Sequence, residues 1–303
     1  MVDLSYLPEP LRNPNNCHKD LISGWPYSYG YRPSLAAGIV FCLLFGIALF
    51  GHCIQAIRLR RWTSILLAIG VLTKSKLAAE LIGWIGRTWS AECPYNQNAY
   101  LMQITTLIIA PVFVTAAIYV LLGLLIMLLG REASILSPRM YNIVFVTCDV
   151  ISLVLQAIGG AMASQASGQR KDPTPGTNVM LGGVVFQLIS MTLFAGLAID
   201  FTRRLTRMSV PSGHFMVIGA MFVSLTAVYI RSIFRTIELA EGWTGYLMTH
   251  EKYFVGLDGC LMVLAVGVLL LFDPAWIIPR YSTSFRRSST GPKSSDAGSS
   301  IEM

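Results

Sequence analysis

Long runs of apolar residues, separated by short polar segments, dominate the chain from residue 33 onward. A helix needs about 20 mostly apolar residues to cross the hydrocarbon core of a bilayer. Stretches such as IVFCLLFGIALF (39–50) and LMVLAVGVLLLF (261–272) belong to runs of that length. The pattern predicts an all-α polytopic membrane protein with seven transmembrane helices, at about 33–57, 63–86, 98–129, 140–163, 179–200, 213–237 and 253–273.

Composition supports this prediction. Of the 303 residues, 54% are hydrophobic and only 13% are charged, and the mean hydropathy is +0.59. A typical soluble domain carries about 25% charged residues, so this composition suits lipid better than water. The net charge of +7 is spread over the connecting segments. Since nucleic-acid binding requires a clustered basic face, we expect no nucleic-acid partner.

Basic residues in the connections predict the orientation of the helices. Twelve Lys and Arg residues fall in the odd-numbered connections and the C-terminal tail, against seven in the N-terminal segment and the even-numbered connections. Because cytoplasmic loops carry the excess of Lys and Arg, the N-terminus is predicted outside and the C-terminus inside. The chain then divides into an extracellular N-terminal segment (1–31), a seven-helix domain (32–275) and a basic, Ser-rich cytoplasmic tail (276–303) whose composition predicts disorder.

Two of the six cysteines fall in segments predicted to lie outside the cell. Cys17 is in the N-terminal segment, and Cys93 is in the connection between the second and third predicted helices. The other four cysteines fall within predicted spans, where they act as small apolar residues. Because disulfides persist in oxidising compartments, we expect a disulfide between Cys17 and Cys93.

Polar residues at helical spacing mark four of the predicted spans. A charged side chain near the bilayer centre costs about 2.5–3.5 kcal/mol on the insertion scale, so it usually faces protein or a wet cavity. Spacings of three, four and seven residues place these side chains on one face of each helix. The four stripes are Lys76, Glu80, Gly83 and Arg87; Asp149, Gln156 and Gly160; Ser224, Arg231, Arg235 and Glu238; and Glu251 and Asp258.

Depth along the predicted spans suggests how these charges pair. Glu80, Arg231 and Arg235 fall in the outer halves of their helices, and Asp258 begins near the outer third of the last helix. Because arginine pairs bidentately with carboxylates, at least one of the two arginines is predicted to contact Glu80 or Asp258. Such a cluster either locks helix packing or lines a substrate path, and the sequence leaves both interpretations open.

Two further polar groups lie away from this cluster. Asp149 is nearer the predicted midplane, where Lys74 or Lys76 is a possible partner. His52 and Gln55, near the cytoplasmic end of the first span, form a possible second polar site. An interhelical hydrogen bond is the more ordinary role for such a pair.

Several long stretches resemble the fungal RTA-like proteins, the lipid-translocating exporter family. The resemblance runs in order over roughly residues 27–275. It is carried by YGYRPSLAAGIVFCLLFGIALFGHCIQ, AELIGWIGR, LIIAPVFVTAAIYVLLG, FVTCDVISLVLQAIGG, GGVVFQL and YIRSIFRTIELAEGWTGYLMTHEKYFVGLDG.

The resemblance implies a seven-spanning, multi-pass protein of the fungal plasma membrane. Members of the family are linked to resistance to toxic amphiphiles, to export or translocation of sphingoid long-chain bases and phospholipids, and in one branch to porphyrin or haem traffic. A long-chain base carries an amine, with which Glu80, Asp149 or Asp258 could pair. The matched positions include Glu80, Arg87, Asp149, Gln156, Arg231, Arg235, Glu238, Glu251 and Asp258.

Other function classes receive less support from the sequence. Seven spans with an external N-terminus also suit a receptor that senses a lipid or small molecule, and this alternative stays open. The chain has no GxxxxGK[ST] phosphate loop. Its four histidines show no HExxH spacing, and no nucleophile motif stands out. We therefore expect neither an enzyme nor a bound metal or cofactor.

Overall fold

The structure is a computed structural model of the chain. It describes residues 17–24, 27, 29–58, 64–130, 132, 134–169, 171–207, 213–243 and 245–272. Within the helices, the side chains of residues 55–58, 64–76 and 167–168 are left out of this description. Residues 1–16 and the predicted tail, 276–303, lie outside the described residues.

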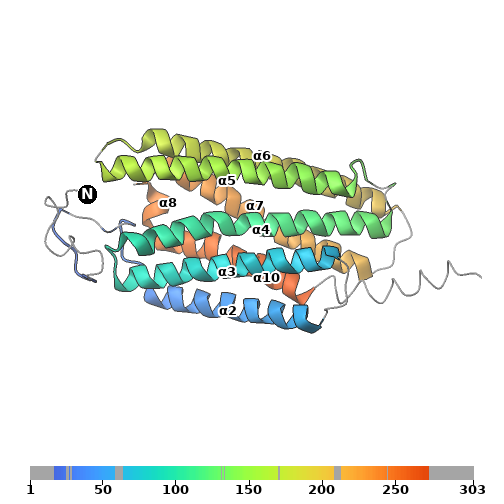
Figure 1. Cartoon of the computed structure of the whole chain (residues 1–303), viewed down its shortest axis with the longest axis horizontal. Helices are drawn as coiled ribbons and strands as arrows, with labels where there is room; N and C mark the ends of the chain where they lie inside the picture. Colours follow the sequence, from blue (N-terminus) through green and yellow to red (C-terminus); the bar gives the residue numbers. More distant parts are fainter. Residues whose placement is uncertain are drawn as a thin grey trace, which may run out of the picture.

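The described residues form helices and no strand. Figure 1 shows the long helices running side by side along the long axis, with α2 at one edge and α5 and α6 at the other. The elements are α2 (Leu35–Arg58), α3 (Ser64–Glu92), α4 (Gln97–Leu129), α5 (Pro138–Gly168), α6 (Thr174–Leu205), α7 (Gly213–Glu241), α8 (Tyr246–Thr249), α9 (Glu251–Tyr253), the π-helix η2 (Phe254–Cys260) and α10 (Leu261–Leu271).

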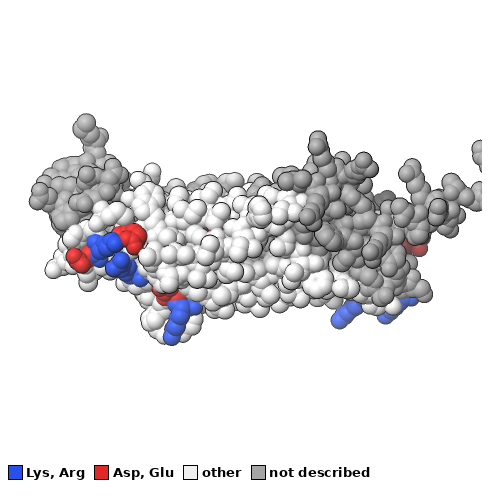
Figure 2. Space-filling model, turned by 90° about the horizontal axis from the view of Figure 1, so that it is seen from below, with Lys and Arg blue, Asp and Glu red and all other residues white. Residues whose placement is uncertain are grey.

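Six of these segments are long and apolar enough to cross a membrane. They lie in α2, α4, α5, α6 and α7 and in the continuous run from Glu251 to Leu271. On the face shown in Figure 2, the visible charged side chains lie toward the two ends of the long axis, and the surface between them is uncharged. The chain is therefore a multi-pass membrane protein. The second predicted span corresponds to α3, which is 29 residues long. The side chains of its first half lie outside the described residues, so its crossing of the membrane stays a prediction.

Local sequence explains where α4 begins and ends. The side chain of Asn96 accepts hydrogen bonds from the backbone N–H groups of Asn98 and Ala99, as a helix N-cap does. At the other end, Gly130 adopts a φ of 126°, which residues with a Cβ rarely reach. Between these two signals, the helix runs for 33 residues, most of which are apolar.

Small residues bring α5 and α6 into close contact. A Cβ added to Gly159 would lie 2.4 Å from the backbone N of Met180, and one added to Gly176 would lie 2.4 Å from the backbone N of Ala163. Glycines at such positions let helix backbones approach within van der Waals distance, which drives association in lipid. The two helices therefore form one tightly packed pair.

Two differences from the predicted spans matter for the site. α6 begins at Thr174 and ends at Leu205, so it extends beyond the predicted 179–200 at both ends. The last predicted span is interrupted by the seven-residue π-helix η2, which contains Asp258. Single π-helical turns are rare and occur often at functional sites.

Candidate functional site

A buried ion-pair network connects α7 with η2. Arg231 Nε lies 2.8 Å from Asp258 Oδ1, and Arg235 Nε lies 3.5 Å from the same oxygen. Arg235 Nη1 also pairs with Glu238 Oε2 at 2.6 Å, one turn along α7. The prediction that at least one of the two arginines contacts Glu80 or Asp258 is therefore confirmed at Asp258, which lies close to both.

The network extends to α3 and α4. Arg231 Nη2 donates a hydrogen bond to the backbone carbonyl of Leu107 at 2.8 Å. Glu80 is 1% exposed, and its carboxylate acts electrostatically on Arg235. Ion pairs of this kind stay intact only where hydrogen bonds and counter-charges replace the lost water. A direct contact of Glu80 with either arginine stays a prediction.

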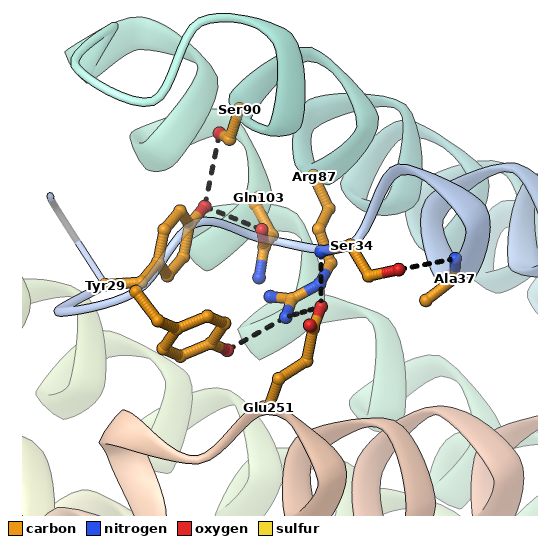
Figure 3. A network of polar contacts seen from close by, with 8 residues as sticks. Tyr29, Ser34, Ala37, Arg87, Ser90, Gln103 and Glu251 are labelled. Carbon is orange, nitrogen blue, oxygen red and sulfur yellow. Dashed lines mark hydrogen bonds and ion pairs between the residues drawn. The ribbon is translucent and has the colours of Figure 1, made fainter. Parts of the chain in front are cut away.

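A second ion pair, between Arg87 and Glu251, is shown from close by in Figure 3. Arg87 Nη2 donates to Glu251 Oε1 at 2.8 Å and to the Tyr31 hydroxyl at 2.9 Å. Glu251 Oε1 also accepts from the backbone N–H of Ser34 at 2.8 Å. The guanidinium carbon of Arg87 lies 4.4 Å from the centre of the Phe254 ring, which adds a cation–π contact. Arg87 and Glu251 thus join α3, α9 and the segment before α2.

The segment before α2 covers this end of the site. The Tyr29 hydroxyl donates to Gln103 Oε1 at 2.6 Å and lies 3.3 Å from Ser90 Oγ. Burial raises the pKa of Tyr29 to about 12, so the hydroxyl remains a donor at neutral pH. Cys17 and Cys93 are joined by a disulfide, with their Cα atoms 4.4 Å apart.

Asp149 occupies a separate position on α5. Its side chain is fully buried, and its Oδ2 lies 2.5 Å from Thr115 Oγ1 on α4. Further along α5, Gln156 Nε2 donates to Ser152 Oγ at 2.7 Å and to Gln187 Oε1 on α6 at 3.1 Å. The polar stripe predicted on this helix therefore faces its neighbours α4 and α6.

Some of the predicted polar residues have side chains outside the part of the chain that the structure describes. The side chains of Lys74, Lys76 and Gln55 lie outside the described residues, so their predicted contacts stay untested. His52 is buried and interacts with other residues of the protein. Among the described residues, no group of three His, Cys, Asp or Glu side chains has the arrangement of a metal site.

A cleft opens between the first half of α4 and the second half of α5. Its volume is about 680 Å³, within the usual range for small-molecule sites. The wall is mostly apolar, with Ile104, Ile108, Leu153 and Ala157 among the lining residues. Polar side chains also line the cleft, among them those of Gln97, Tyr100, Gln156, Ser164, Gln165 and Trp243.

The cleft adjoins two smaller cavities that reach the ion pairs. Ile108 and Met180 line the cleft and both smaller cavities. One cavity contains Arg231 and Arg235. The other contains Arg87, Arg235 and Glu238 beneath Tyr29 and Tyr31. An apolar chain in the cleft could therefore present a polar group to the ion-pair network.

Several residues around the site were not predicted. The sequence pattern indicated no role for Tyr29, Tyr31, Gln103, Trp243 or Phe254, although all five line the cavity beside Arg235. A polar residue inside an apolar span was an available signal for Gln103. The tyrosines precede the first predicted span, and only the folded chain brings them over α3 and α4.

Known proteins share much of this sequence. The family model described as RTA1 like protein matches residues 76–281. The sphingoid long-chain base transporter RSB1 of Saccharomyces cerevisiae is 31% identical over 294 residues, covering 84% of this chain and 75% of that protein. From the same yeast, Protein RTA1 is 28% identical over 271 residues, covering 81% of this chain and 84% of that protein. Protoporphyrin uptake protein 1 is 27% identical over 273 residues, covering 78% and 89%. No solved structure matches the chain.

Proposed function

Because the chain belongs to the RTA1-like family, we propose that it translocates amphiphilic lipids across the bilayer. The substrate class that we favour is a single-chain lipid with an amine head, such as a sphingoid long-chain base. The observation that carries this proposal is the apolar cleft between α4 and α5, which adjoins a buried network of ion pairs. A similar relative is named as a transporter of such bases.

The cleft suits the apolar part of the substrate. In a bilayer, the opening between α4 and α5 faces lipid, so an acyl chain can enter from the side without crossing water. Ile104, Ile108, Leu153 and Ala157 offer it an apolar surface. Burial of apolar surface against protein rather than lipid gains little free energy, so the polar head has to provide the specificity.

The charge balance of the network favours a cationic head. Three basic side chains, Arg87, Arg231 and Arg235, face four acidic ones. Among the side chains that the structure describes, the network thus has one more acidic group than basic groups, and an amine head would add a charge-assisted hydrogen-bond donor to it. The acidic residues are Glu80, Glu238, Glu251 and Asp258.

The membrane topology forms part of the proposal. We infer seven spans, with α3 as the second, and with the N-terminus outside and the C-terminus in the cytoplasm, most simply at the plasma membrane. Support comes from the excess of basic residues on one side. The disulfide between Cys17 and Cys93 then lies on the external, oxidising side. The cavity beneath Tyr29 and Tyr31 then opens near the outer leaflet.

Reconstitution tests this function. Full-length protein in vesicles is given a fluorescent long-chain base, and movement between leaflets is followed by quenching from outside with a membrane-impermeant reagent. Translocation several-fold faster than in protein-free vesicles is expected, and so is a large loss in the Glu238→Gln variant. The Glu241→Gln variant, at the exposed end of α7, serves as a control. Equal rates with and without the protein contradict the proposal, and binding without movement favours a receptor.

A further inference from the structure

Asp149 is a buried acid that lies apart from the ion-pair network. Its side chain is 0% exposed and forms no ion pair with any residue that the structure describes. Its partner Thr115 lies eight residues beyond Leu107 on α4, which is about 12 Å along the helix. Since Leu107 is the contact of Arg231, Asp149 lies roughly two helical turns deeper than the network.

The other buried acids of the membrane-spanning segments are each associated with a basic side chain among the described residues. Asp258 pairs with Arg231, Glu238 with Arg235, and Asp200 with Arg204. Glu80 acts electrostatically on Arg235, and Glu251 pairs with Arg87. A carboxylate that is buried without such a partner is strongly disfavoured, and it takes up a proton instead.

The hydroxyl of Thr115 gives independent geometric support for a bound proton. Thr115 Oγ1 lies 3.0 Å from the backbone carbonyl oxygen of Val112 and 2.5 Å from Asp149 Oδ2. A hydroxyl has one proton to donate, so it cannot donate to both oxygens at once. Both short contacts are satisfied when Thr115 donates to Val112 and a protonated Asp149 donates to Thr115. The 2.5 Å separation lies within the range of O–H···O bonds.

Few titratable groups face Asp149 from the helices packed against it. α4 contributes Tyr119, a neighbouring phenol that acts on Asp149 both through its charge and through its hydroxyl, and α5 itself contributes Cys148 beside Tyr119. The stretch of α6 from Val184 to Ile199 contains no titratable residue. The second oxygen, Asp149 Oδ1, is buried and receives no hydrogen bond from the described residues.

A polar track connects Asp149 with the cleft. Ser152 and Gln156 follow it at steps of three and four on α5, so Gln156 lies about 10.5 Å further along the helix. Gln156 lines both the cleft and the cavity that contains Arg231. Water that enters the cleft could reach Asp149 along these side chains and exchange its proton.

We propose that Asp149 is a proton-binding site that couples translocation to the proton gradient. The coupling rests on the proposed function, whereas the bound proton does not. In the packed state that we propose, Asp149 is neutral and buried between α4 and α5. When the helices separate and water enters, Asp149 loses its proton, and the charged carboxylate favours the opened arrangement. Uptake of a proton restores the packed one.

Infrared spectroscopy tests the bound proton without any transport. At neutral pH, the purified full-length protein is expected to show the carbonyl stretch of a protonated carboxyl group, and the Asp149→Asn variant is expected to lose it. Thr115→Val should shift the band, because it removes the hydrogen-bonding partner and keeps the acid. Asp200→Asn, which changes an exposed acid paired with Arg204, should leave the band unchanged. A band that persists in Asp149→Asn, or is missing from the wild type, overturns the proposal.

Vesicles carrying a proton gradient of about one pH unit test the coupling. That gradient corresponds to a tenfold ratio of proton concentrations, equivalent to about 1.4 kcal/mol. Movement of the fluorescent long-chain base by the wild type should change several-fold with the direction of the gradient, after subtraction of protein-free vesicles. The Asp149→Asn variant should move the lipid at the same rate for both directions of the gradient.

The outcomes separate the two proposals. If the wild type translocates the lipid at a rate that does not depend on the gradient, the coupling is overturned and the proposed function stays intact. If the wild type moves no lipid, the proposed function fails and the coupling fails with it. The infrared band then still decides whether Asp149 binds a proton.

Discussion

Arg231 and Asp258 form a buried ion pair, with Nε 2.8 Å from Oδ1, that joins α7 to the π-helix η2. The two side chains are 5% and 1% exposed. Through Nη2, Arg231 also donates a hydrogen bond to the backbone carbonyl of Leu107 on α4. One guanidinium therefore connects three separate elements of the bundle.

Loss of either partner should destabilise the fold strongly. Truncation of one member of a buried pair leaves the other charge without a partner, which typically costs about 3–5 kcal/mol. Arg231→Ala and Asp258→Ala should each lower the unfolding temperature and the folded fraction in detergent. Because the same interaction is removed, the double variant should lose less than the sum of the single losses.

An exposed pair on α6 provides the control. Arg204 and Asp200 lie 2.9 Å apart with side chains 49% and 39% exposed, and such surface pairs are worth about 0–1 kcal/mol. Arg204→Ala should therefore leave the unfolding temperature nearly unchanged. If Arg231→Ala were equally harmless, the network would have no structural role.

The hydroxyl of Tyr29 should stabilise the cover over the site. Tyr29→Phe leaves the carbonyl of Gln103 without its donor, which costs about 1–3 kcal/mol when the group is buried. The exposed Tyr246 on α8 offers a control in Tyr246→Phe. Thermal unfolding of the two variants in detergent measures the difference.

The pH dependence of this effect follows from the raised pKa. Burial raises the pKa of Tyr29 to about 12 in the folded protein, while an unfolded tyrosine titrates near about 10. The stabilisation by the neutral phenol is therefore complete below about pH 10 and falls as the pH rises from about 10 towards 12. The difference in unfolding temperature between wild type and Tyr29→Phe should stay constant from about pH 6 to 9.

Cys17 and Cys93 should behave as one unit. Their disulfide closes a loop with a sequence separation of 76, and disulfides of natural proteins typically contribute about 2–4 kcal/mol. Cys17→Ser and Cys93→Ser should give the same mobility shift on a non-reducing gel and similar losses of stability. Cys260→Ser, at an exposed free cysteine, should match the wild type. Different shifts for the two variants would argue for another pairing.

The proposed topology predicts opposite fates for two epitope tags. A tag at the N-terminus should be cut by protease added to intact cells, and a tag at the C-terminus should be protected until the cells are opened. Tags with the same accessibility would mean an even number of spans, and α3 would then be the first helix to reconsider.

Much of the site was predictable because a charged side chain in an apolar helix has to face the protein interior or a wet cavity rather than lipid. The spacing of Arg231, Arg235 and Asp258 placed all three toward the protein interior, and the structure brings them together. A charged group that avoids lipid has to meet its counterpart at the same depth. Helical periodicity and depth together therefore identified the centre of the network.

The remaining features depend on how the helices are arranged in space. Arg87 and Glu251 are separated by 164 residues, and their pairing requires α3 and α9 to meet at one end. The cleft arises because α4 and α5 separate over part of their length, which no local pattern encodes. The π-helix around Asp258 likewise depends on packing, since Gly259 lies beneath the rings of Phe41 and Trp84.

Replacement of a glycine in the cleft wall by a larger residue can fill the cleft without disturbing the ion pairs. A Cβ added to Gly160, which lines the cleft, would have only Met180 Sδ within 4 Å, at 3.8 Å. A large side chain at this position therefore projects into open space. Gly182 on α6 is exposed, and a Cβ there would have no atom within 4 Å. Gly182→Phe is thus a matched control that adds the same side chain away from the cleft.

The measurement that tests the central claim most directly is translocation of a fluorescent long-chain base by Gly160→Phe and Gly182→Phe in vesicles. If the substrate passes through the cleft between α4 and α5, Gly160→Phe should lower the rate at least tenfold while its unfolding temperature stays within a few degrees of the wild type. Gly182→Phe should translocate at the wild-type rate. Equal, wild-type rates for both folded variants would contradict the cleft as the path of the lipid.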